Sequence, residues 1–173
     1  MLPVNIPRET KMSIYRSIIT IISLPLLMIA CTQADMTAAE IEKLEAEVMQ
    51  ATLDRNAAYA AGDPDLAFRF FSSATGALEI EDGNYRIISS ETLEDMREFF
   101  GSAEVAFIDI GTPQIRILGR QSAMAFYEGN WSAVDKGTNE EIGSHFLMTL
   151  VWVNEDGKWK VFHKHESTPA LKD

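Results

Sequence analysis

The stretch GSHFLMTLVWVNEDGKWKVFHKHES, residues 143–167, decides the fold of this chain. Its two apolar runs are separated by Asn154-Glu155-Asp156-Gly157, and Asp-Gly between β-rich runs is typical of a tight hairpin turn, because glycine adopts positive φ at little cost. Side chains alternate along a strand. This predicts two sets that each share one face: His145, Leu147, Thr149, Val151 and Val153 in the first strand, and Trp159, Val161, His163, His165 and Ser167 in the second. All three histidines therefore lie on this hairpin, two of them on one face.

The first thirty residues have the pattern of a secretory signal peptide. A basic segment, residues 8–16, precedes residues 17–30, which are uncharged, mostly apolar and too few to span a bilayer. A positive start, a short apolar middle and a small last residue are typical of a segment that is removed from the mature protein. We therefore expect cleavage after Ala30.

Cys31 is the only cysteine of the chain and directly follows this apolar segment. The sequence Leu27-Met28-Ile29-Ala30-Cys31 resembles the lipobox of bacterial lipoproteins, and the resemblance implies that the cysteine is acylated. Several acyl chains would anchor the protein stably, since each buried CH₂ contributes about 0.8 kcal/mol. We therefore expect a protein of the bacterial cell envelope that faces the periplasm. Thr32 in place of an aspartate after the cysteine favours the outer membrane.

The remaining sequence predicts one globular domain. We expect a tether at residues 31–36, a domain at residues 37–168 and a tail at residues 169–173. The chain is 46% hydrophobic and 24% charged, which are globular values. Its formal net charge of −11 at pH 7 argues against nucleic acid as a partner, because nucleic-acid binding needs a basic surface. The sequence has no Gly-rich phosphate loop, and we predict no cofactor.

Helices precede strands in the predicted domain. The predicted elements are a helix from Thr37 to about Ala61 with a capping box at Thr37 and Glu40, a helix opened by Asp63 and Pro64, a helix at residues 91–100 capped by Ser90, and strands at residues 75–81, 85–89, 105–110, 115–118 and 121–134 before the hairpin. Arg55 and Tyr59 fall at the helical spacing of the apolar residues in the first helix. This order of elements is typical of the α+β class.

This order, together with several local motifs, resembles the nuclear-transport-factor-2-like superfamily. The motifs are Gly62-Asp63, the strand from Gly119 to Trp131, and Asp156-Gly157-Lys158-Trp159 leading to His163–Ser167. The likeness is greatest to the SnoaL-like branch, which includes the association domain of calmodulin-dependent kinase. It implies an α+β cone, in which a strongly curved, mostly antiparallel sheet wraps around about three N-terminal helices and encloses a pocket. Many relatives pair through the convex sheet face, so the resemblance also implies a homodimer.

Two residues are candidates for a general base in such a pocket. The superfamily includes isomerases and dehydratases, so one alternative function is an enzyme that uses His165 or Glu128 as the base. Neighbours on a strand point to opposite faces. The residues of the long strand therefore divide into two sets, of which only one is internal, and the sequence leaves open which one: Tyr127, Gly129 and Trp131, or Phe126, Glu128 and Asn130.

The function that we predict is the binding of a small, partly apolar ligand in the pocket of a lipid-anchored envelope protein. The expected ligand-binding residues are Tyr59, Trp131, His145, His163 and His165. His163 and His165 could share a metal ion only with His145 as a third ligand, and we predict no metal site. A homodimeric assembly module is the remaining alternative function.

Overall fold

The computed structural model describes residues 36–168. Its elements in chain order are α1 (Ala38–Ala60), α2 (Pro64–Phe68), β1 (Leu78–Glu81), β2 (Asn84–Ile87), α3 (Ser90–Ser102), β3 (Ala103–Ile110), β4 (Gln114–Gly119), β5 (Ser122–Asp135), β6 (Glu141–Glu155) and β7 (Lys158–Ser167). The predicted signal peptide, the lipidation site at Cys31 and the C-terminal tail lie outside the described residues. Within the described residues, no helix is both long enough and apolar enough to cross a membrane.

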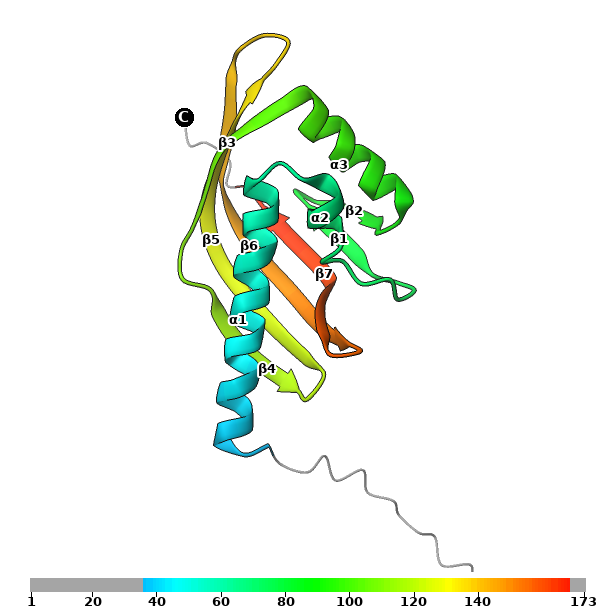
Figure 1. The fold of residues 1–173 in the computed structure, drawn as a ribbon, viewed down its shortest axis with the longest axis vertical. Helices are drawn as coiled ribbons and strands as arrows, with labels where there is room; N and C mark the ends of the chain where they lie inside the picture. Colours follow the sequence, from blue (N-terminus) through cyan, green and yellow to red (C-terminus); the bar gives the residue numbers. More distant parts are fainter. Residues whose placement is uncertain (1–35, 169–173) are drawn as a thin grey trace, which may run out of the picture. The chain divides into compact units, whose positions relative to one another are not determined.

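The strands form one mixed sheet that curls around the helices. The strand order is β2-β1-β7-β6-β5-β3, and β4 also pairs with β5. Every pair is antiparallel except β1 with β7, which is parallel. Figure 1 shows α1 crossing the concave face of the sheet and α3 lying beside the β1–β2 hairpin. The predicted α+β cone is confirmed.

The first two helices begin as their capping residues predict. The Thr37 hydroxyl accepts a 3.2 Å hydrogen bond from the Glu40 amide, and the Glu40 carboxylate accepts a 2.8 Å bond from the Thr37 amide, so the capping box is complete. Gly62 follows α1 with φ of +65°, and Asp63 caps α2. These signals are local, because each joins residues no more than three positions apart.

The cap of α3 is Ser89, one residue before the predicted Ser90. Ser89 has an extended backbone, with φ of −151° and ψ of −176°, and its hydroxyl accepts from the Glu91 amide at 3.2 Å. Ser90 is already helical. With two serines in succession, the residue that keeps the extended backbone is the cap.

The turn between β6 and β7 is the tight hairpin that the sequence predicts. Asp156 has φ of +52° and Gly157 has φ of +81°, as a two-residue hairpin turn requires.

On β5, Tyr127 faces the core and is 2% exposed, whereas Glu128 faces outward. The internal set is therefore the one that contains Tyr127 and Trp131.

A β-bulge interrupts the alternation of side chains along β7. Val161 pairs with Trp152 of β6, but His163 pairs with Val151, the residue just before Trp152. Phe162 is therefore an extra residue on β7, opposite no partner of its own. An extra residue shifts every later side chain to the opposite face.

The bulge overturns the predicted faces in the second half of β7. Trp159 faces the core, as predicted, and is buried. His163 and His165 instead face outward, because they follow the bulge. Lys164 and Glu166 take the inward positions, and Lys164 is buried at 6% exposure.

Candidate functional site

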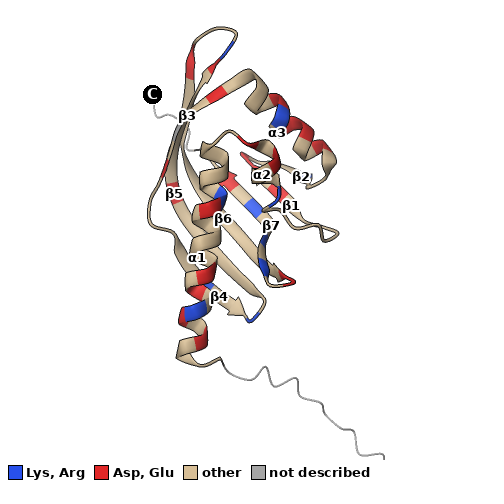
Figure 2. Ribbon diagram, in the orientation of Figure 1, with Lys and Arg blue, Asp and Glu red and all other residues tan. Residues whose placement is uncertain are grey.

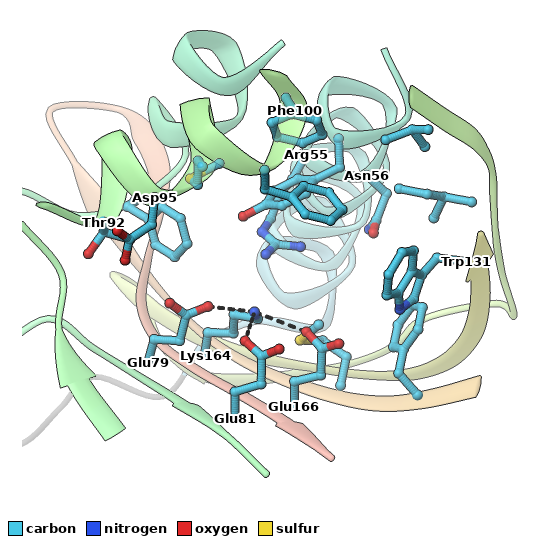
Figure 3. Close-up of a pocket in the computed structure, with 18 of the residues that line it drawn as sticks. Arg55, Asn56, Glu79, Glu81, Thr92, Asp95, Phe100, Trp131, Lys164 and Glu166 are labelled. Carbon is cyan, nitrogen blue, oxygen red and sulfur yellow. Dashed lines mark hydrogen bonds and ion pairs between the residues drawn. The ribbon is translucent and has the colours of Figure 1, made fainter. Parts of the chain in front are cut away.

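A cavity of about 380 Å³ lies between the concave face of the sheet, α1 and α3. This volume falls in the range of small-molecule sites. The lining consists of Arg55, Asn56 and Tyr59 of α1; Thr92, Asp95, Met96, Phe99 and Phe100 of α3; and Phe71, Glu79, Glu81, Arg86, Val105, Ile108, Trp131, Ser144, Phe146, Met148, Lys164, Glu166 and Thr168 from the strands and loops. Figure 3 shows many of these side chains converging on one space.

One side of the cavity is an aromatic wall, formed by Tyr59, Phe99, Phe100 and Trp131. The ring centroids of Phe99 and Phe100 are 5.3 Å apart, those of Phe99 and Trp131 6.0 Å, and those of Tyr59 and Phe100 6.1 Å. All three pairs are edge-to-face, an arrangement that rings favour because of their quadrupoles. This wall offers an apolar surface to a bound molecule.

Arg55 reaches the cavity from α1 and is only 2% exposed. Its guanidinium lies over the Tyr59 ring, 4.5 Å from the ring centroid, and Nη1 donates a 3.4 Å hydrogen bond to Tyr127 Oη. The Nε atom is buried without a partner. Among residues 36–168, no carboxylate oxygen lies within 4.0 Å of an Arg55 nitrogen, the distance that defines an ion pair. A guanidinium has five N–H donors, so most of its hydrogen-bonding capacity is unused.

The phenol of Tyr127 accepts from Arg55 and is itself held by Asn56. The Asn56 side-chain amide donates to the Thr52 carbonyl at 2.8 Å and also lies 3.2 Å from Tyr127 Oη. Burial raises the pKa of the Tyr127 phenol above its usual value, so the phenol is neutral at physiological pH. The guanidinium is therefore positioned by a neutral hydroxyl and keeps its full positive charge.

The opposite side of the cavity is a charged floor, formed by Glu79, Glu81, Lys164 and Glu166. Lys164 Nζ lies 2.5 Å from a Glu79 oxygen, 2.9 Å from a Glu166 oxygen and 3.4 Å from a Glu81 oxygen; Figure 3 marks these contacts. Burial lowers the pKa of Lys164, but the carboxylates of Glu166 and Glu79 raise it more, so its pKa is well above the usual value. The amine is permanently protonated and cannot serve as a base or nucleophile at neutral pH.

Arg86 of β2 connects this floor to α3. Its Nε donates to Glu79 at 2.8 Å, and its Nη1 pairs with Asp95. Burial raises the pKa of the Glu79 carboxyl, but Lys164 and Arg86 lower it more, so its pKa is below the usual value. Glu79 is therefore ionised, with both oxygens occupied. Acidic residues continue along α3 (Figure 2).

The structure separates the five residues predicted to bind a ligand. Tyr59 and Trp131 line the cavity, and their role in binding stays a prediction. His145, His163 and His165 lie on the outer face of the sheet instead, which corrects their predicted place in the pocket. His145 faces outward by simple alternation along β6, and the other two do so because of the bulge in β7.

The two candidate general bases, Glu128 and His165, also face away from the cavity. The Glu128 side chain is 67% exposed, and its nearest basic partner is His145, with 3.9 Å between oxygen and nitrogen. A general base must come within hydrogen-bonding distance of the proton that it removes. Neither residue lines the cavity, so their predicted place in the pocket is wrong, and a catalytic role for either stays a prediction.

Sequence reasoning missed the charged residues of the cavity, chiefly Arg55, Glu79, Lys164 and Glu166. One of them could have been found from the sequence: Arg55 occupies a position of the apolar stripe of α1, where a buried charge is rare unless it is paired. Lys164 gave no such signal, because plain alternation placed it outside. Within residues 36–168, no group of three or more histidine, cysteine or acidic residues is arranged to hold a metal ion.

Several solved structures have this fold. A nuclear transport factor 2-like protein from Salmonella enterica serovar Typhimurium superposes with a TM-score of 0.65 at 18% identity, covering 76% of this chain and 95% of that one. A ketosteroid isomerase-like protein from Erwinia carotovora atroseptica gives 0.64 at 11% identity, with 75% and 97% covered. The association domain of the calcium/calmodulin-dependent kinase from C. elegans gives 0.58 at 19% identity, with 76% and 100% covered. These structures show that the fold is nuclear-transport-factor-2-like.

The family can be stated more narrowly from the sequence. The family model of the calcium/calmodulin dependent protein kinase II association domain matches residues 44–170, which is most of the chain. The chain belongs to this family. No curated protein sequence matches it.

Proposed function

We propose that this chain is a lipid-anchored protein of the bacterial envelope whose cone binds a small molecule with a carboxylate on a partly apolar body. The observation that carries the proposal is the buried Arg55, whose Nε has no partner and whose guanidinium points into the cavity. A further part, the assignment to the SnoaL-like branch, stays a prediction from sequence.

A buried cation without a counterion favours an anionic ligand. Burial lowers the pKa of Arg55, but the phenols of Tyr59 and Tyr127 and the carboxylates of Glu166 and Glu79 raise it more, so the guanidinium is always charged. An unpaired charge of this kind in a protein interior costs on the order of several kcal/mol. The planar fork of N–H donors matches the two oxygens of a carboxylate, which a ligand would bring.

The rest of the ligand would lie against the aromatic wall. Phe99 and Trp131 present ring edges and faces there, and Met148 and Phe146 continue the apolar surface on β6. Apolar area removed from water contributes about 25 cal/mol per Å². The charged end of the ligand would therefore lie at Arg55, and its apolar body would lie against the aromatic wall.

The test compares acids with their uncharged amides on the mature protein in mild detergent. Isothermal titration with 3-phenylpropanoate and hexanoate, each against its amide, should show the acid binding about tenfold or more tightly, because a charge-assisted hydrogen bond is worth roughly 1.5–3 kcal/mol. Arg55→Met should abolish this preference and Arg55→Lys should keep part of it. Arg116→Met, on an exposed position of β4, is the matched control and should change nothing. Equal affinity for acid and amide in the unaltered protein would contradict the proposal.

The lipid anchor has its own test. Cys31 is the residue that the lipobox-like sequence marks for acylation, and acyl chains on it would attach the protein to the membrane. Cys31→Ser should therefore shift the protein from the membrane fraction to the soluble periplasmic fraction, as judged by fractionation and by loss of fatty-acid labelling. Retention of the variant in the membrane with unchanged labelling would rule out the anchor.

A second candidate function is homodimeric assembly through the outer face of the sheet. This face carries large apolar side chains in contact with water, with Phe126 39% and Leu147 37% exposed. The two residues lie on adjacent strands, β5 and β6, two register positions apart. An apolar patch of this kind on a sheet is typical of a protein–protein contact, and the family is defined by an association domain. Pocket binding and assembly use opposite faces and are compatible.

A further inference from the structure

We propose that the ligand of the cavity is a zwitterion, an amino acid-like molecule whose protonated amine binds the carboxylates of Glu81 and Glu166 while its own carboxylate meets Arg55. The inference rests on the proposed function and adds the second charged group of the ligand. In Figure 3 the Arg55 guanidinium points from α1 toward the floor that these carboxylates form. A molecule that fills the space between them meets a cation on one side and an acidic surface on the other.

The floor carries more negative than positive charge. Four carboxylates, those of Glu79, Glu81, Asp95 and Glu166, are joined to only two cations, Lys164 and Arg86. The network therefore keeps two formal negative charges. It faces Arg55, which has no ion-pair partner among residues 36–168. A simple anion would gain from Arg55 and be repelled by this surplus, whereas a zwitterion complements both groups.

Two carboxylate oxygens of the floor are open to a ligand. Glu79 uses both of its oxygens, one for Lys164 and one for Arg86. Glu81 and Glu166 each contact Lys164 through Oε2 alone, and nothing in the described part of the chain occupies their Oε1 atoms. A carboxylate accepts about four hydrogen bonds, so both residues can take an ammonium donor without releasing Lys164.

The geometry suits an ammonium group better than a metal ion. Lys164 Nζ already occupies the point where three carboxylates converge, at 2.5, 2.9 and 3.4 Å. This point is where a cation bound by all three would have to lie, and among the described residues no group of three is arranged to hold a metal ion. A second ammonium can still bind at the outer oxygens, since its three donors reach separate acceptors.

The experiment titrates the mature protein, in mild detergent, with matched pairs that differ only in the amine. The pairs are L-phenylalanine against 3-phenylpropanoate and 6-aminohexanoate against hexanoate, chosen to place the amine near to and far from the carboxylate. We expect the amino acid of at least one pair to bind about tenfold more tightly than its partner. Glu166→Gln should remove this preference and leave the affinity for the amine-free acid unchanged or higher.

Two further variants separate loss of the ammonium site from misfolding and from a general change of charge. Glu81→Gln changes a half-exposed side chain that is not needed for the core, and it should also reduce the preference. Glu128→Gln changes an exposed carboxylate on the outer face and should leave the preference intact. If the amine-free acids bind as tightly as the amino acids in both pairs, the zwitterion is excluded while the carboxylate site at Arg55 stands. If no member of either pair binds, both proposals fail together.

Discussion

Lys164 is the single residue on which the charged floor of the cavity depends. Its ammonium contacts three carboxylates, two of which, Glu79 and Glu166, have little exposure to solvent. Lys164→Met should lower the free energy of unfolding by about 3–5 kcal/mol, because it leaves buried carboxylates without their main partner. Urea denaturation measures the loss, and Lys158→Met, on an exposed position of the same strand, should change stability by less than about 0.5 kcal/mol.

The pH dependence of the same variant distinguishes charge from packing. The pKa of Glu79 is below its usual 4.5, so its stabilising contribution is present above pH 4.5 and is lost as the pH falls through the lowered value. The pKa of Lys164 is above its usual 10.5, so its contribution is present below pH 10.5 and is lost as the pH rises through the raised value. The deficit of Lys164→Met should therefore be largest between these limits and shrink in acid. A deficit that does not shrink as the pH is lowered to the acid limit of the folded state would indicate lost packing instead.

At the scale of the element, β7 shows which features of the fold the sequence could predict. Its hairpin turn was predictable because Asp156 and Gly157 determine their own backbone conformation. Its faces were predictable only as far as Val161, because the bulge at Phe162 arises from the pairing with β6 and leaves no local pattern. The reversal moved two histidines out of the expected site and brought Lys164 in.

The candidate site also has one part that the sequence predicts and one part that depends on tertiary pairing. The cavity and two of its aromatic side chains, Tyr59 and Trp131, follow from the family resemblance and from periodicity. The charged half depends on tertiary pairing, since Glu79 approaches Lys164 only because β1 lies parallel to β7. Parallel pairing between distant segments has no short-range signal. Arg55 is the exception, because a charge on an apolar helical stripe is visible in the sequence.

The packing of β5 against its neighbours depends on a glycine, Gly129, that admits their close approach. A Cβ atom on Gly129 would lie 2.6 Å from the Asp109 carbonyl oxygen and 2.7 Å from the Phe146 ring. Gly129→Ala should therefore cost about 1–3 kcal/mol of unfolding free energy, as overpacking does. Gly101→Ala is the control, since nothing lies within 4 Å of a Cβ there, and alanine in α3 should be neutral or stabilising by up to about 1 kcal/mol. Thermal unfolding of both variants checks the difference, and equal melting temperatures would contradict it.

For the whole molecule, the two faces of the sheet differ in the side chains that they present. The concave face supplies the core and the cavity, with Trp152 and Leu150 fully buried. The outer face gathers all three histidines of the chain beside exposed apolar side chains. A second copy could cover the exposed apolar side chains of this face and leave the polar groups around them at a solvated rim. The proposed assembly through this face is therefore separable from the proposed ligand binding.

This separation gives the last prediction. The mature protein should sediment as a homodimer in density-matched detergent, and the double variant Phe126→Asp, Leu147→Asp should sediment as a monomer, because a dimer would have to bury four additional carboxylates in an apolar contact. The variant should still discriminate 3-phenylpropanoate from its amide, since neither residue lines the cavity. Leu53→Asp, an exposed leucine of α1 that is 41% accessible, should leave the dimer intact. A monomeric unaltered protein at its highest soluble concentration would remove assembly through this face, and loss of ligand discrimination in the double variant would show that the two faces are coupled.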